Sequence, residues 1–169
     1  IETYLMKFKT SLFMLTTFYL LLATSIYART TPEDIVNSKK DSYNQTVQNY
    51  SPENKQKLDS YSQKIATLNK IITDDYQFNM ETQALILNEY IKRNPEQASS
   101  SQVENAQYWL TYAHEAVAFQ AAKIYIFELS GESSINSNIT SQINILQAET
   151  NTLRNKVQKS QNIIMELVK

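Results

Sequence analysis

The sequence of 169 residues has no cysteine, one glycine, one histidine and three prolines. The absence of cysteine excludes disulfides, thiolate metal sites, a cysteine nucleophile and the lipid-bearing cysteine of a bacterial lipoprotein. With one glycine, the chain has no glycine-rich loop of the kind that binds phosphate. A chain without disulfides has to be held together by packing, which favours long helices over a small, loop-rich scaffold.

Positive and negative charges nearly balance, and neither sign is concentrated in one stretch. The formal net charge is −1 at pH 7, and no basic run or acidic tail occurs. Neither nucleic acid nor an anionic membrane surface is therefore indicated as a partner. The chain has no motif of a catalytic nucleophile, of a helical zinc site or of a calcium loop. We therefore predict no enzymatic activity, no metal site and no cofactor.

One strongly apolar run lies near the N-terminus. Met6 opens a short basic stretch, and residues 11–26 form a predominantly apolar run without charged residues, as in a secretory signal peptide. We predict that residues 1–28 are upstream residues plus this signal peptide, with cleavage after Ala28. Because the run is short for a membrane-spanning helix, an uncleaved N-terminal anchor is the alternative, and it would supply the only membrane contact. The expected location is secreted or in the periplasm or cell envelope.

The prolines mark predicted helix starts. Pro32, Pro52 and Pro95 each follow a residue that caps helices and precede a glutamate, which suits the first turn of a helix. A capping-box pattern offers Ser101 as a second start near Pro95. Gly131 is predicted to end a helix in the left-handed conformation. Helices are thus expected at residues 32–49, 52–93, 95 or 101 to 129, and 137–168.

Apolar periodicity fits these four segments. The second is predicted to bury a line of residues, namely Leu58, Tyr61, Ile65, Leu68, Ile72, Tyr76, Met80, Ala84, Leu87 and Ile91. The last keeps a heptad seam in which Thr150 and Ser160 take polar positions. No strand is predicted. Residues 29–169 should form one all-α domain, an elongated antiparallel bundle of three long helices with a shorter N-terminal helix. Three- and four-helix packing both remain open.

The widest apolar face occurs at residues 103–127. Leu110 and Val117 belong to its main line, and Trp109 and Phe119 to a second line. We expect this segment to be the core helix, held between two long partners, with Trp109 and Phe119 buried. Replacement of Leu110 or Val117 by aspartate should unfold such a domain.

The same segment carries the candidate binding residues. These are Tyr108, Tyr112, His114 and Glu115, where aromatic rings could pack while their hydroxyl groups stay wet. A metal site at His114 would need a carboxylate one turn earlier, but residue 111 is threonine. A histidine at the surface or at the edge of a groove is therefore expected.

These features favour an exported, non-catalytic binding, scaffold or assembly module of the cell envelope. Its partner would be another protein or a second copy of the chain. The alternative is a holdase-type envelope chaperone, which would cradle unfolded clients between long helices. The third reading is a bundle that binds a small ligand or cofactor, which would need several convergent ligands.

Overall fold

The computed structural model describes residues 31–169, so the predicted signal peptide and its cleavage site lie outside the described residues. Of the described residues, 85% are helical and none forms a strand, which confirms the all-helical prediction. The helices are α2 (Pro32–Val47), α3 (Pro52–Arg93), α4 (Ser101–Ala121) and α5 (Ile135–Leu167), with single 3-10 turns at Pro95–Gln97 and Glu132–Ser134. Within residues 31–169, no helix has both the length and the apolar character needed to cross a membrane.

The chain divides into two units, residues 1–38 and residues 39–169. The described part of the first unit is the start of α2, where a reciprocal cap forms. Asp34 Oδ2 accepts hydrogen bonds from the backbone N–H and the hydroxyl of Thr31, at 2.8 and 2.7 Å. The Thr31 hydroxyl oxygen in turn accepts one from the N–H of Asp34. This geometry satisfies N–H groups that have no partner within the helix.

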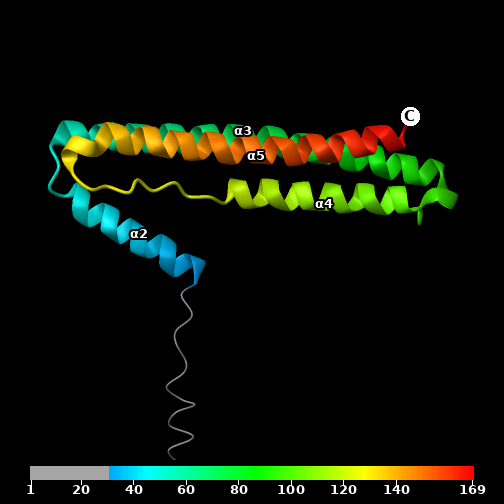
Figure 1. Ribbon diagram of the computed structural model, residues 1–169, viewed down its shortest axis with the longest axis horizontal. Coiled ribbons are helices and arrows are strands. Elements are labelled where there is room, and N and C mark those ends of the chain that lie inside the picture. The colour runs from blue at the N-terminus through cyan, green and yellow to red at the C-terminus, as the bar shows by residue number, and fades with distance from the viewer. Residues whose placement is uncertain (1–30) are drawn as a thin grey trace, which may run out of the picture. The chain divides into compact units, whose positions relative to one another are not determined.

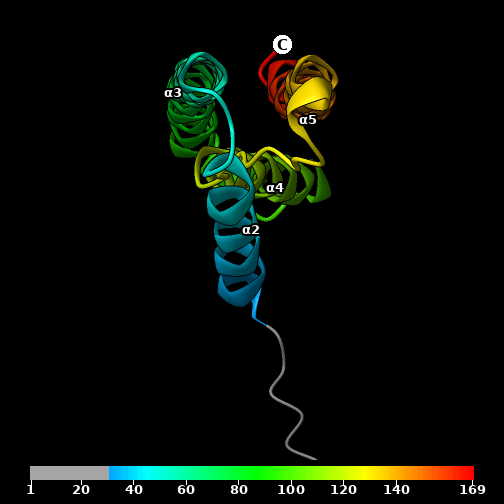
Figure 2. The ribbon, with the colours of Figure 1, turned by 90° about the vertical axis from the view of Figure 1, so that its left-hand side faces the viewer.

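Helices α3, α4 and α5 of the second unit pack pairwise against each other. In Figure 1, α3 and α5 run in the same direction and α4 runs back between their ends, as the sequence predicted for neighbouring helices. Figure 2 shows the three helices nearly end-on. The predicted start of α3 is confirmed, because Ser51 caps it with Pro52 at the first position. Helix α4 begins at Ser101 after the short turn at Pro95, but its capping residue is Ser100 and not Ser101, as the capping-box pattern had predicted.

The predicted seam of α5 is confirmed, including its two polar positions. Leu146, Leu153 and Ile164 are buried, and Thr150 and Ser160 are buried between them. The Thr150 hydroxyl donates to the backbone oxygen of Leu146 at 2.8 Å, and the Ser160 hydroxyl donates to Gln83 Oε1 on α3 at 2.7 Å. Buried hydroxyl groups are tolerated in a seam when each has such a partner.

The inner face of α3 differs from the prediction in its middle. Leu58, Ile65, Met80 and Leu87 are buried as expected, but Leu68 is 51% exposed. Three polar residues take inner positions instead, namely Asn69, Thr73 and Gln83. Each of these finds a hydrogen-bond partner inside the bundle, which offsets the cost of removing it from water.

The predicted end of the third helix is wrong. We expected it at residue 129, but α4 ends at Ala121 and the chain continues in extended form towards Ser130. Residues 123–129 read KIYIFEL, and β-branched and aromatic side chains favour an extended backbone over a helix. The predicted left-handed Gly131 is wrong for the same reason. Its φ is 168°, which is extended, because the helix that it was expected to end stops well before it.

Asn69 of α3 completes the end of α4. Its side-chain amide donates to the backbone oxygen of Gln120 at 3.0 Å, and its Oδ1 accepts from Gln120 Nε2 at 2.8 Å. In a continuing helix that backbone oxygen would accept from the N–H of residue 124. Here it accepts from the N–H of Lys123 at 3.1 Å, and the buried side chain of Asn69 adds a second hydrogen bond from a neighbouring helix.

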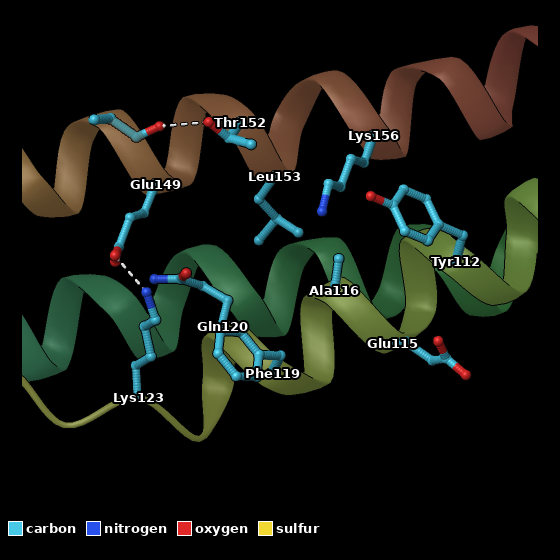
Figure 3. A pocket seen from close by; sticks show the side chains of 11 residues that line it. Tyr112, Glu115, Ala116, Phe119, Gln120, Lys123, Glu149, Thr152, Leu153 and Lys156 are labelled. Atoms are coloured by element: carbon cyan, nitrogen blue, oxygen red, sulfur yellow. Dashed lines mark hydrogen bonds and ion pairs between the residues drawn. The ribbon is translucent and has the colours of Figure 1, made fainter. Parts of the chain in front are cut away.

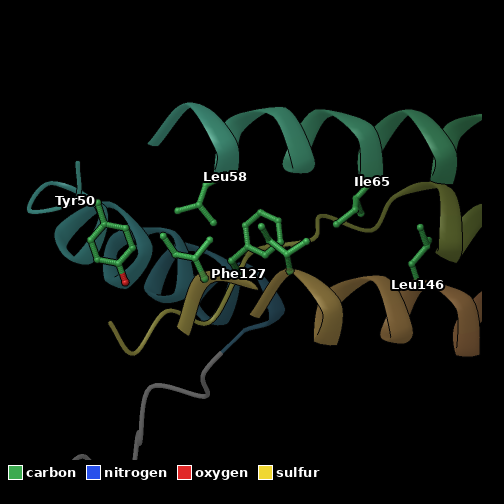
Figure 4. Close-up of a cluster of buried hydrophobic side chains, with 7 residues drawn as sticks. Tyr50, Leu58, Ile65, Phe127 and Leu146 are labelled. Atoms are coloured by element: carbon green, nitrogen blue, oxygen red, sulfur yellow. The ribbon is translucent and has the colours of Figure 1, made fainter. Parts of the chain in front are cut away.

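Beyond α4, large side chains fill the core. Phe127 of the extended segment is 3% exposed and packs in a cluster with Leu58, Ile65 and Leu146. Figure 4 shows these residues together with Tyr50, which closes the cluster at the turn before α3. The extended segment is therefore a packed part of the second unit.

Candidate functional site

A groove between α4 and α5 is the best-formed concave site among the described residues, with a volume of about 450 Å³. Its lining residues are Tyr112, Glu115, Ala116, Phe119, Gln120 and Lys123 of the α4 side and Ala148, Glu149, Thr152, Leu153 and Lys156 of α5. We call it the α4/α5 groove, and Figure 3 shows it from close by. Pockets of this size accommodate a small molecule or a few side chains of a partner.

The helical repeat explains why these residues meet. On α4, Tyr108, Tyr112, Glu115 and Phe119 follow each other at steps of three or four, so they share one flank of the helix. The buried face of α4 lies beside this flank and is made of small residues such as Ala113 and Val117. Small residues allow α5 to come close, so the larger side chains stand at the rim of the contact rather than inside it.

Phe119 is therefore not a core residue, contrary to the prediction. Its side chain is 68% exposed, whereas Trp109 is half-buried. Helix α4 buries one face against α3 and α5 and presents an aromatic flank to solvent. Exposed aromatic residues gathered beside a groove are typical of binding surfaces.

Three aromatic rings of α4 pack on one another beside the α4/α5 groove. Tyr108 and Tyr112 are parallel, with ring centroids 6.1 Å apart and an interplanar angle of 2°. Trp109 meets both edge-on, at 5.6 Å from Tyr108 and 5.5 Å from Tyr112. Such packing holds the rings in place before any partner arrives, which lowers the entropy lost on binding.

Two lysines of α5 lie over these rings. Lys159 Nζ is 3.9 Å from the ring centroid of Trp109, and Lys156 Nζ is 4.6 Å from that of Tyr112. A ring face attracts a cation, so both ammonium groups are held against α4. Within residues 31–169, neither lysine forms an ion pair with a carboxylate. Both therefore keep their charge available for an anionic group.

The opposite end of the groove is a closed polar network. Lys123 pairs with Glu149 Oε1, and the Tyr125 hydroxyl donates to Glu149 Oε2 at 2.7 Å. Gln120 Nε2 donates to the oxygen of Tyr125 at 2.5 Å and so joins the network to Asn69. Burial opposes the charged form of Glu149, but these hydrogen bonds outweigh it and lower its pKa. Burial and the bond to Glu149 raise the pKa of Tyr125.

The structure brings together three of the four candidate binding residues. Tyr112 and Glu115 line the groove, and Tyr108 stacks on Tyr112. Glu115 points away from the groove floor in Figure 3. His114 is exposed and is not part of the lining, as expected for a surface histidine.

The sequence reasoning missed the α5 side of the site. Glu149, Thr152, Lys156 and Lys159 follow each other at steps of three or four beside the core line of α5. This spacing places them on one flank, and the heptad seam could have revealed that flank. What it could not reveal was which flank of α4 lies opposite.

No group of three histidine or carboxylate side chains within residues 31–169 could hold a metal ion. Comparison with protein-family models, with curated proteins and with solved structures finds no match to this chain. The functional assignment therefore rests on the geometry of the α4/α5 groove.

Proposed function

We propose that this protein is an exported, non-catalytic binding module of the cell envelope, and that the α4/α5 groove holds a segment of a partner protein. The partner segment would place an apolar side chain on Phe119 and Leu153 and an acidic side chain near Lys156 and Lys159. Export is inferred from the basic and apolar stretches of residues 6–28.

One observation carries the proposal: two lysines without a carboxylate partner within residues 31–169 lie over packed aromatic rings beside an apolar floor. An acidic group on the partner could pair with them at low cost, because the rings already restrict the lysine side chains. Aromatic anchors with a charged rim are the usual composition of the centre of a protein interface.

The test is capture of the partner from the native envelope by full-length protein carrying a photo-crosslinker at Tyr108, beside the groove. We expect a discrete cross-linked protein that is lost when Lys156 and Lys159 are both replaced by glutamate. The chain offers a matched control, because Lys64 lies over Tyr61 on α3 at 4.9 Å in the same way but outside the groove. Lys64→Glu should leave capture unchanged. Equal capture by all three proteins would contradict the proposal.

A holdase-type chaperone is the second candidate, and one observation favours it. Ile71, Phe78 and Leu85 lie seven residues apart on α3 and are 59%, 69% and 70% exposed. Such a stripe could hold unfolded chains without sequence preference. Replacement of Phe78 and Leu85 by serine should then abolish any suppression of client aggregation, whereas the two glutamate substitutions on α5 should not.

A further inference from the structure

Two helices form the walls of the α4/α5 groove. Its lining runs from Tyr112 to Gln120 within α4 and from Ala148 to Lys156 within α5, with Lys123 just beyond the end of α4. Eight steps at 1.5 Å per residue make each wall about 12 Å long. That length corresponds to about two turns of a bound helix or to about four residues of an extended chain.

The backbones of these walls have no hydrogen-bonding group left for a partner. Residues 112–117 and 148–156 lie inside α4 and α5, where each N–H and C=O group pairs along its own helix. A partner segment that binds in extended form usually pairs its backbone with an exposed strand edge. Neither wall provides such an edge, so the groove does not suit an extended segment.

Several polar side chains of the lining are also paired. The Gln120 amide, the Glu149 carboxylate and the Thr152 hydroxyl each make a hydrogen bond within residues 31–169. Tyr112 and Lys156 lie at the end of the groove away from the Glu149 network, as Figure 3 shows. An extended backbone along the groove would therefore leave buried N–H and C=O groups without partners, which is costly.

An α-helix has no such need, because it pairs its own backbone. The groove also has space for one. Its walls carry a small residue each, Ala116 and Ala148, beside the larger Phe119 and Leu153. Small residues next to large ones form the holes into which the side chains of a third helix pack.

The two lysines beside the rings define where such a helix carries charge. Lys156 follows Leu153 by three residues and Lys159 follows it by six, which is about 4.5 and 9 Å further along α5. A helix that lies along α5 covers these distances in about one and two turns. A carboxylate at that spacing from an apolar side chain on Leu153 would reach a lysine that has no carboxylate partner within residues 31–169.

We propose that the partner segment is an amphipathic α-helix that lies along the α4/α5 groove. It places an apolar side chain on Phe119 and Leu153 and a carboxylate one or two turns away, at Lys156 or Lys159. This class of partner rests on the proposed function, since a segment must first occupy the groove. The apolar residues of the segment should recur at steps of three and four.

Distances along the groove separate a helix from an extended chain. Tyr108 and Phe119 are eleven residues apart on one line of α4, or about 16 Å, and are 61% and 68% exposed. A photo-crosslinking phenylalanine derivative is placed at either position of the full-length protein, and mass spectrometry identifies the partner residue that it reaches. We expect the two partner residues to be about eleven apart, against about five in an extended segment. Phe78, 69% exposed on α3, is the matched control and should not reach that segment.

The possible outcomes distinguish the helix from the groove itself. A spacing near five residues with capture intact would overturn the helix and leave the proposed function standing. No captured protein from either position would contradict the proposed function, and the helix with it.

A synthetic peptide of the captured segment gives a second measurement. Proline at a central, outward-facing residue should weaken its binding to the full-length protein roughly a hundredfold relative to alanine at the same residue, because proline interrupts a helix. Equal binding of the two peptides would also overturn the helix.

Discussion

Helices α3 and α5 run side by side along the bundle. Over part of their length they pack against helix α4, and over the rest they pack against the extended segment that follows α4. Along α4 the inward residues are small, as at Ala106 and Ala113, which are fully buried. Along residues 122–131 they are large, as at Tyr125 and Phe127. The backbone of an extended chain is thinner than a helix, which with its side chains is about 10–12 Å wide, so larger side chains are needed to fill the same space.

The change occurs at the buried polar contact between Asn69 and Gln120. On the helical side of this contact the outer flank of α4 carries the aromatic residues of the groove. On the extended side the aromatic residues turn inward, and the backbone of residues 124–130 makes no backbone hydrogen bond within residues 31–169. The end of α4 at this contact therefore decides both where the groove ends and where the extended segment begins. Substitutions in the two halves and at their junction should differ in effect, from the largest in the helical half to the smallest at Gly131.

The largest effect is expected in the helical half. Val117→Asp places a carboxylate at a position that is 1% exposed among Ala113, Met80 and Leu153, so it should prevent folding. Phe119→Asp, two residues further on, is the matched control, because that side chain is 68% exposed. Circular dichroism should show loss of helix for the first variant and a cooperative thermal transition for the second. Cooperative unfolding of Val117→Asp near the original temperature would contradict this packing.

The extended half should depend on its large side chains. Phe127→Ala removes a ring that is 3% exposed and should cost about 3–5 kcal/mol of unfolding free energy. Ile124→Ala, on the outward side of the same segment, should cost less than about 0.5 kcal/mol. Urea denaturation measures both. Similar small losses for the two variants would mean that the extended segment is not packed as described.

The junction itself should show an intermediate effect. Asn69→Leu removes the two buried hydrogen bonds with Gln120, and at about 0.5–1.5 kcal/mol for each bond the expected cost is about 1–3 kcal/mol. Asn88→Leu is the control, because Asn88 is exposed on the same helix. Urea denaturation should separate the two variants clearly. An equal or greater stability of Asn69→Leu would show that α4 does not need this contact to end at Ala121.

Only part of the junction at the end of α4 could be predicted from the sequence. Steps of three and four link Ala121, Ile124 and Phe127 and predict a continuing helix, and no strand was predicted, although Tyr125, Phe127 and Leu129 also follow each other at steps of two. The buried polar contact at the junction comes from Asn69, which lies 51 residues before Gln120 and cannot be paired with it by local pattern. The seam of α5 was predictable to the residue because its heptads repeat without interruption, polar positions included. Only the α4 side of the groove was predictable. The lysines of α5 become candidate binding residues only because they lie over the aromatic rings of α4, and the sequence does not show that contact.

At the far end of the extended half, a carboxylate gives an acid-dependent effect. Glu132 Oε1 accepts hydrogen bonds from the Ser51 N–H, the Ser51 hydroxyl and the Asn54 side chain at the start of α3, and they lower its pKa to about 2. A carboxyl with a lowered pKa stabilises the fold above its ordinary pKa, and this contribution is lost as pH falls towards the folded value.

Glu132→Gln should therefore be less stable than the unmodified protein near neutral pH, and the difference should shrink as the pH falls from about 4.5 to about 2. Urea midpoints at several pH values measure this. Glu166→Gln is the control, because Glu166 makes no side-chain hydrogen bond or ion pair within residues 31–169. A difference that stays constant with pH would remove Glu132 from the acid response.

The smallest effect, and one whose sign is informative, is expected at Gly131. If this glycine ended a helix in the left-handed conformation, alanine would destabilise the protein. Its φ of 168° is extended instead, and a Cβ there would meet no atom within 4 Å. Gly131→Ala should therefore stabilise the fold by about 0.4–1 kcal/mol, because alanine restricts the unfolded chain. A lower thermal midpoint than that of the unmodified protein would favour a continuous helix to residue 129 over the extended segment.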